Sequence, residues 1–135
     1  MANLTFTQIF GNSYNAGYVP ENDEMEAFFS LSSFKSVDDG GELENGLGIS
    51  DFNTNRSNYE RNGNKGINIF YALMLMIMQN QAEGKNDDPE QKIYIAPGGV
   101  SVVSFGNRTG QLERRFTVSI YSDGEYGNTA DVDSI

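Results

Sequence analysis

The chain has 135 residues, the usual size of one domain, and 38% of them are hydrophobic, so one compact core is expected. It contains neither cysteine nor histidine, which excludes disulfide bonds, thiol nucleophiles and histidine acid–base or metal chemistry. A formal net charge of −10 disfavours tight binding to nucleic acid or to an anionic membrane, because both depend on clustered lysine and arginine.

The N-terminal quarter predicts two short strands. Residues 4–10 are mostly apolar or β-branched and end at a glycine. A second strand is expected over residues 26–34, because Ala27, Phe29 and Leu31 recur at every second position. The acidic residues just before this segment are also typical of the first turn of a helix, but the alternation favours a strand. The first residues lack the basic start of a signal peptide, so a soluble protein is expected.

A long polar loop is predicted at about residues 38–66, a segment rich in Gly, Asn, Asp and Glu. Loops of this length are uncommon in compact domains unless they are functional or disordered. Apolar residues are scattered along it, which indicates that parts of the loop pack against something: Leu43, Leu47, Ile49, Phe52 and Tyr59.

The clearest element is a helix over residues 67–82, dominated by good helix formers, with Gly84 placed as a C-terminal cap. Residues 69–78 are all apolar, too short a run to cross a membrane. A surface helix would carry a polar stripe, so this one is expected to be covered on most sides. A lone subunit of this size has little to cover it with, which favours a homo-oligomer.

The last third predicts a β-meander. Its strands are separated by a tight turn at Pro97-Gly98-Gly99 and by a glycine-bracketed hairpin loop. The segments are residues 92–96, 100–105 and 116–121, with the loop at 106–110. The fold class expected from all elements is mainly β (α+β): one domain spanning residues 1–135, an antiparallel β-sandwich or barrel with one central buried helix.

No catalytic, cofactor or metal site is predicted. Asp51, Asn53 and Asn55 are spaced like the opening of a calcium loop, but Arg56 stands where the loop needs glycine and Asn62 where it needs a bidentate glutamate. The carboxylates include no pair that stands out for acid–base work. A monomeric β-sandwich binding module, with or without calcium, remains the alternative to an assembly subunit, and a carboxylate enzyme is a third hypothesis.

Basic residues gather in two places. Arg56, Arg61 and Lys65 precede the apolar helix, and Arg114 and Arg115 form a smaller pair. In so acidic a chain they are candidates for pairing with acidic patches on a neighbouring copy, with ordinary surface charge as the equal alternative. Met74 and Met78 are further interface candidates, because methionine adapts to irregular partners, although core packing is the simpler role for both.

The order of elements resembles that of structural subunits of tailed bacteriophages, especially tail-tube proteins. The early strands, the loop at 38–66, the helix at 67–82 and the closing hairpin at 100–121 carry this likeness. The resemblance implies a subunit of stacked rings, with long loops bridging the rings and acidic groups lining a passage for DNA. It implies a virion location after assembly in the host cytoplasm, with other virion proteins and further copies as partners. Capsid decoration, neck and baseplate roles stay open.

Overall fold

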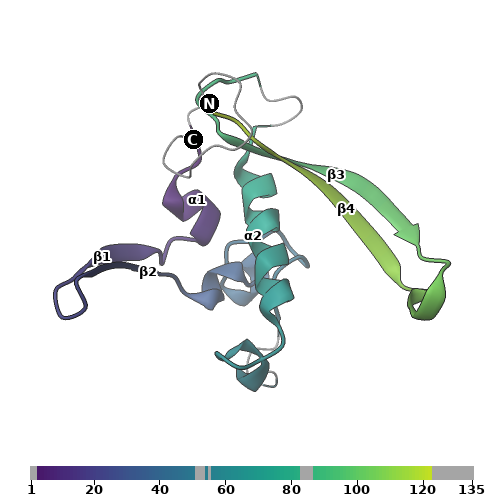
Figure 1. The fold of residues 1–135 in the computed structure, drawn as a ribbon, viewed down its shortest axis with the longest axis horizontal. Helices are drawn as coiled ribbons and strands as arrows, with labels where there is room; N and C mark the ends of the chain where they lie inside the picture. The colour runs from purple at the N-terminus through teal and green to yellow at the C-terminus, as the bar shows by residue number, and fades with distance from the viewer. Residues whose placement is uncertain (1–2, 51–53, 55, 83–86, 123–135) are drawn as a thin grey trace. The chain divides into compact units, whose positions relative to one another are not determined.

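The computed structural model of the chain describes residues 3–50, 54, 56–82 and 87–122. Contacts between residues divide the chain into two compact units (Figure 1). The helical unit is Leu4–Gln81, and the ribbon unit comprises Met1–Asn3 together with Ala82–Ile135.

The described residues of the helical unit form two α-helices, one β-hairpin and three short 3-10 helices. The helices are α1 (Phe6–Phe10) and α2 (Gly66–Asn80), and the hairpin joins β1 (Asn15–Val19) to β2 (Glu24–Phe28). The 3-10 helices are η1 (Leu31–Phe34), η2 (Val37–Asp39) and η3 (Arg56–Tyr59).

The strand predicted over residues 4–10 is wrong, because this segment forms α1. Thr5 caps the helix: its Oγ1 accepts a hydrogen bond from the Gln8 backbone N at 3.2 Å. The Gln8 side-chain Oε1 in turn accepts from the Thr5 backbone N at 2.8 Å. This reciprocal capping box satisfies two backbone donors that a helix start leaves unpaired, and it outweighs the alternation of apolar residues.

The strand predicted over residues 26–34 is confirmed only in its first part, since β2 ends at Phe28 and η1 follows. Ser30 caps η1 by accepting a hydrogen bond from the Ser32 backbone N at 3.2 Å. Ser30, which stands between Phe29 and Leu31 in the alternating pattern, therefore serves as a cap, a role in which a short hydroxyl competes with strand pairing.

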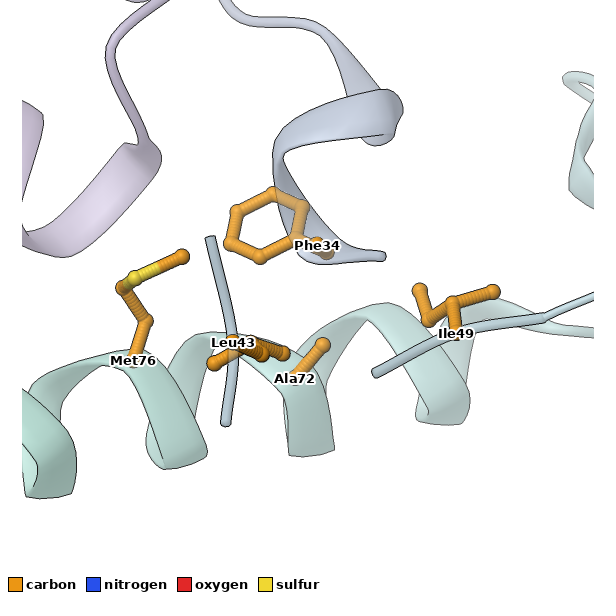
Figure 2. Close-up of a cluster of buried hydrophobic side chains, with 5 residues drawn as sticks. All are labelled: Phe34, Leu43, Ile49, Ala72 and Met76. Carbon is orange, nitrogen blue, oxygen red and sulfur yellow. The ribbon is translucent and has the colours of Figure 1, made fainter. Parts of the chain in front are cut away.

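The core of the helical unit lies between α2 and the segment that precedes it (Figure 2). Its buried members are Phe34, Leu43, Ile49, Ala72 and Met76. Two of them, Leu43 and Ile49, come from the polar loop at 38–66, which confirms that parts of this loop pack against the rest. Leu47 is exposed instead, and Phe52 lies outside the described residues.

The main helix was correctly predicted, but it is not enclosed on every side. Ala72, Met74, Met76 and Ile77 are buried, whereas the first turns expose large apolar side chains. Ile67 is 76% exposed, and Phe70 and Tyr71 are exposed as well. The expectation of a central buried helix therefore holds from Ala72 onward and not for the first turns. The predicted cap at Gly84 lies outside the described residues.

The ribbon unit contains an antiparallel pair, β3 (Ile93–Val102) and β4 (Leu112–Ile120), joined through η4 (Gly106–Arg108). The hairpin loop at 106–110 is confirmed. The tight turn at Pro97-Gly98-Gly99 is wrong, because β3 runs straight through it with a bulge between Pro97 and Val100. Gly99 has φ +97°, which lets the chain add a residue without breaking the pairing.

The described residues thus form a mixed α+β structure with two separate two-stranded antiparallel sheets and one main helix. They do not form a closed barrel, because each sheet keeps two open edges. The sandwich is not confirmed either. Within the described part of the chain, no helix is long and apolar enough to cross a membrane.

Candidate functional site

The tip of the β1–β2 hairpin is held by a side-chain hydrogen bond. The Tyr18 hydroxyl donates to Asp23 Oδ1 at 2.5 Å, and this bond raises the pKa of Tyr18 above its ordinary value of 10.0. Asp23 has φ +51°, a left-handed conformation that Asp tolerates better than most residues. Pro20 starts the turn, where its fixed φ suits the first corner position.

The β1–β2 hairpin carries exposed apolar side chains along one face. Its register places Ala16 opposite Ala27 and Tyr18 opposite Met25, so these four side chains share a face. Met25 is 70% exposed, and the strand residues are exposed on both faces, with Val19 alone half-buried. A two-stranded hairpin is marginally stable by itself in water and gains stability when a face is covered.

The β3–β4 ribbon has a longer apolar face. Alternate residues of β4 share a face with their partners on β3, which include Ile95 opposite Val118 and Val102 opposite Leu112. Ile95 itself is buried, so this face is already covered at that position and is exposed at others. Val102 is 65% exposed, and four other large apolar residues of this face are also about half exposed or more: Val100, Leu112, Val118 and Ile120. Exposed apolar surface of this kind marks an interaction site more often than an accident of composition.

The first basic cluster stands where the sequence placed it, just ahead of α2. Arg56 is exposed and forms an i,i+4 ion pair with Glu60, with 3.7 Å between Nε and Oε1. Arg61 is exposed, whereas Lys65 is half-buried and occupies the N-cap position of α2. An exposed ion pair contributes little to stability. The pair between Arg56 and Glu60 therefore does little to hold the fold, and the positive charge of the cluster can serve contacts with a partner.

The two methionine candidates differ in access. Met74 is buried and Met78 is half-buried, so only Met78 offers appreciable surface. A better surface on α2 is the stripe formed by Ile67, Phe70 and Tyr71. Residues three and four apart lie on one helical face, and this one is exposed next to the basic cluster in the sequence.

The described residues contain little that suggests catalysis or metal binding. They include no group of three or more carboxylates placed to hold a metal ion. A shallow cavity of about 210 Å³ in the ribbon unit is lined by Asp87, Asp88, Pro89, Gln91, Lys92, Tyr121 and Ser122. That volume is below the roughly 300–1,000 Å³ of typical ligand pockets. The calcium hypothesis falls largely outside the described residues, because 51–53 and 55 are not among them.

Comparisons with protein-family models, with curated proteins and with solved structures found no match to this chain. The candidate site is therefore defined by its geometry alone: three exposed apolar surfaces, on the β1–β2 hairpin, on the β3–β4 ribbon and on the first turns of α2.

Sequence reasoning missed the two hairpin surfaces. The β1 segment Asn15–Val19 begins with asparagine, alanine and glycine, residue types that are depleted in strands, so it does not stand out as a strand. The apolar alternation in β4 was recognised, but alternation alone does not reveal whether a face is covered. Exposure depends on which other layer packs against the sheet, and that is a property of the folded chain.

Proposed function

We propose that the protein is a non-enzymatic structural subunit that associates with further copies of itself. The observation that carries this proposal is the exposed apolar face of the β3–β4 ribbon. Ile95 on this face is already buried, but residues such as Val102 and Leu112 are exposed, and they are removed from water only when another layer packs against them. The apolar faces of the β1–β2 hairpin and of the first turns of α2 add to the surface that association would cover.

Association also accounts for the predicted fold class. Two separate two-stranded sheets become part of a sandwich or barrel when strands of neighbouring copies extend or cover them. Open sheet edges favour such pairing, because each edge carries unpaired backbone N–H and C=O groups. In this proposal the sandwich or barrel is a property of the assembly, and the single chain supplies its parts.

Among assemblies, we propose a virion component of a tailed bacteriophage, of the tail-tube type or a related tail or capsid role. The later part of the element order, from the loop at 38–66 through the main helix to the closing hairpin, supports this, and so does the net charge of −10. The first segment does not contribute, because residues 6–10 form α1. An acidic lining repels DNA phosphates, so DNA would pass through a ring of such subunits without being held. Other virion proteins and further copies are the proposed partners, and the virion is the proposed location.

Light scattering coupled to size-exclusion chromatography tests self-association. The purified chain, examined over a series of rising concentrations, should show a mass of several copies that grows with concentration. Negative-stain microscopy of the most concentrated sample should then show rings or tubes. A single-chain mass at every concentration would contradict the proposal. Discrete small oligomers without rings or tubes would support association but argue against the tail-tube role.

A further inference from the structure

The two hairpins carry opposite charges. Residues 15–28, which form the β1–β2 hairpin, contain four carboxylates and neither lysine nor arginine: Glu21, Asp23, Glu24 and Glu26. Residues 93–120, which form the β3–β4 ribbon, contain three arginines and one glutamate: Arg108, Arg114, Arg115 and Glu113. In a chain with a net charge of −10, the ribbon is thus a positive island.

Arg114 is the arginine that belongs to the apolar face of the ribbon. It lies opposite Val100 in the register and alternates with Leu112 and Phe116 along β4. Arg115 points to the other face, where its Nε donates to Glu113 Oε1 at 2.5 Å. Arg114, by contrast, forms no ion pair with any residue in the described part of the chain. Its charge is therefore available to a partner that covers the apolar face.

The bulge in β3 is what makes this face continuous. Between Pro97 and Val100 the strand adds one residue relative to β4. Without the added residue, Val100 and Val102 would change faces, since a shift of one residue moves every following side chain to the other side of a strand. With it, both valines share the face of Ile95, and the apolar surface extends along the ribbon up to Val102.

We propose that the β1–β2 hairpin of one copy packs on the apolar face of the β3–β4 ribbon of a second copy. The proposal rests on the self-association put forward above and names its interface. Ala16, Tyr18, Met25 and Ala27 form the contact face of the hairpin. Glu21 and Asp23 lie in the turn at one end of that face, whereas Glu24 and Glu26 lie on the opposite face of β2 and add to the negative charge of the hairpin as a whole. Arg114 and Arg108 supply the complementary positive charge.

The charges also decide between this arrangement and its symmetric rivals. Two β1–β2 hairpins placed together would pair two segments that each carry four carboxylates and no basic residue, and two ribbons would bring their Arg114 side chains together. Like charges in contact destabilise both arrangements, whereas the unlike pair is attractive and fixes orientation. Because the two surfaces differ, each copy donates one and accepts the other. Such head-to-tail contacts generate rings when they close and filaments when they do not.

Two charge-reversal variants test the pairing. The first variant carries Glu21→Lys, Glu24→Lys and Glu26→Lys in its hairpin, so its hairpin and its ribbon are both positive. The second variant carries Arg108→Glu and Arg114→Glu in its ribbon, so its hairpin and its ribbon are both negative. Each variant by itself should associate at least about tenfold more weakly than the wild-type chain, because both of its contacts become repulsive. An equimolar mixture should recover association, because the hairpin of each variant then meets a ribbon of opposite charge.

A third variant controls for net charge. Asp38→Lys, Glu44→Lys and Glu90→Lys change the same number of exposed carboxylates outside both hairpins and outside the basic cluster, and this variant should associate like the wild type. Circular dichroism confirms that each variant is folded before its mass is measured at low salt. If the mixture regains the mass of an assembly, the contacts that form it must join different chains. That result also excludes the alternative in which the hairpin and the ribbon of one chain pair with each other.

The outcomes separate this inference from the proposed function. If the wild type associates and either variant alone associates equally well, the hairpin–ribbon contact is wrong while self-association stands. If both variants are monomeric and their mixture is monomeric too, the contact is again wrong. A wild-type chain that is monomeric throughout overturns the proposed function, and the contact with it.

Discussion

The side chain of Asn80, in the last turn of α2, donates a hydrogen bond from Nδ2 to the backbone carbonyl oxygen of Gln8 in α1, at 2.7 Å. The bond is partly buried and joins two helices that lie 72 positions apart in the sequence. The Gln8 carbonyl belongs to one of the last residues of α1, where carbonyls have no partner within the helix. Asn80 therefore holds a five-residue helix against the helix that carries the core.

Asn80→Ala should lower the free energy of unfolding by about 0.5–1 kcal/mol. The lost hydrogen bond is worth roughly 1 kcal/mol, and the higher helix propensity of alanine offsets part of it. Asn80→Asp should lower it further, because a carboxylate would place an acceptor against the Gln8 carbonyl. Urea unfolding of the three proteins measures both effects. A variant with aspartate as stable as the wild type would show that the bond is not formed in solution.

Two phenylalanines of the same unit offer a matched test of the core. Phe34 is 0% exposed and lies at the centre of the buried cluster, whereas Phe28, at the end of β2, is 61% exposed. Phe34→Ala should lower the free energy of unfolding by about 3–5 kcal/mol, through lost burial and the cavity it leaves. Phe28→Ala should change it by less than about 0.5 kcal/mol in the monomer. Urea unfolding measures both changes. If the two substitutions lower the free energy of unfolding equally, Phe34 does not lie at the centre of the core.

The elements that sequence reasoning predicted well are those fixed by local chemistry. The main helix follows from the Ala, Leu and Met residues that dominate it between residues 72 and 78, and the loop at 106–110 follows from its bracketing glycines. The capping box of Thr5 and Gln8 is also local, and its Thr-x-x-Gln spacing could have identified α1. The apolar and β-branched residues at 4–10 favour a strand by composition, so α1 is predicted only when this capping spacing is weighed against them.

The features that the sequence could not supply depend on distant partners. Whether Pro97-Gly98-Gly99 makes a turn or a bulge is decided by β4, which pairs on both sides of it. The exposure of the apolar face next to that bulge depends on which layer covers it. Likewise, Leu43 and Ile49 belong to the core only because α2 packs beside a loop that looks polar from its composition.

Gly41 stands where the chain passes close to itself. A Cβ added there would lie 2.0 Å from the backbone carbonyl oxygen of Lys35, a contact that real atoms do not tolerate. The two segments are joined nearby by the hydrogen bond from Leu43 N to Lys35 O, at 3.2 Å, so neither is free to move away. Gly41→Ala should therefore lower the free energy of unfolding by about 1–3 kcal/mol.

Gly17 in β1 provides the control, since a Cβ there meets nothing within 4 Å. Gly17→Ala should leave the stability unchanged or raise it by up to about 1 kcal/mol, because alanine has less backbone freedom to lose on folding. Thermal unfolding followed by circular dichroism distinguishes the two variants. An unchanged melting temperature for Gly41→Ala would mean that the loop between Lys35 and Leu43 is open.

The stripe on α2 makes a prediction about association and not about folding. Phe70→Ser should reduce self-association while changing the free energy of unfolding by less than about 0.5 kcal/mol, because Phe70 is exposed within the chain. Arg61→Glu should act in the same direction if the neighbouring basic cluster belongs to the same interface. Val37→Ser, which removes an exposed apolar side chain outside α2 and both hairpins, is the control. Light scattering that gives the same mass for all four proteins would remove this stripe from the interface.

The hydrogen bond between Tyr18 and Asp23 predicts a dependence on pH at the alkaline end. The bond keeps the proton on the Tyr18 hydroxyl and so raises its pKa above 10.0 in the folded chain. A raised folded pKa means that the bond's contribution to hairpin stability is present below pH 10.0 and is lost as the pH rises through the folded value. Deprotonation would place a phenolate beside a carboxylate, which opens the tip of the hairpin.

Tyrosine Cζ chemical shifts, followed by NMR as the pH is raised, measure this titration directly. Tyr18→Phe assigns the resonance, and Asp23→Ala should return the pKa of Tyr18 toward 10.0. Asp23→Asn separates charge from hydrogen bonding, because it retains the oxygen acceptor and tolerates the left-handed backbone at this position, with φ +51°. Its Tyr18 pKa should lie between those of the wild type and Asp23→Ala. A wild-type Tyr18 that titrates at the same pH as in Asp23→Ala would show that the turn is open in solution, and the contact face at Tyr18 and Met25 would then lack a fixed shape.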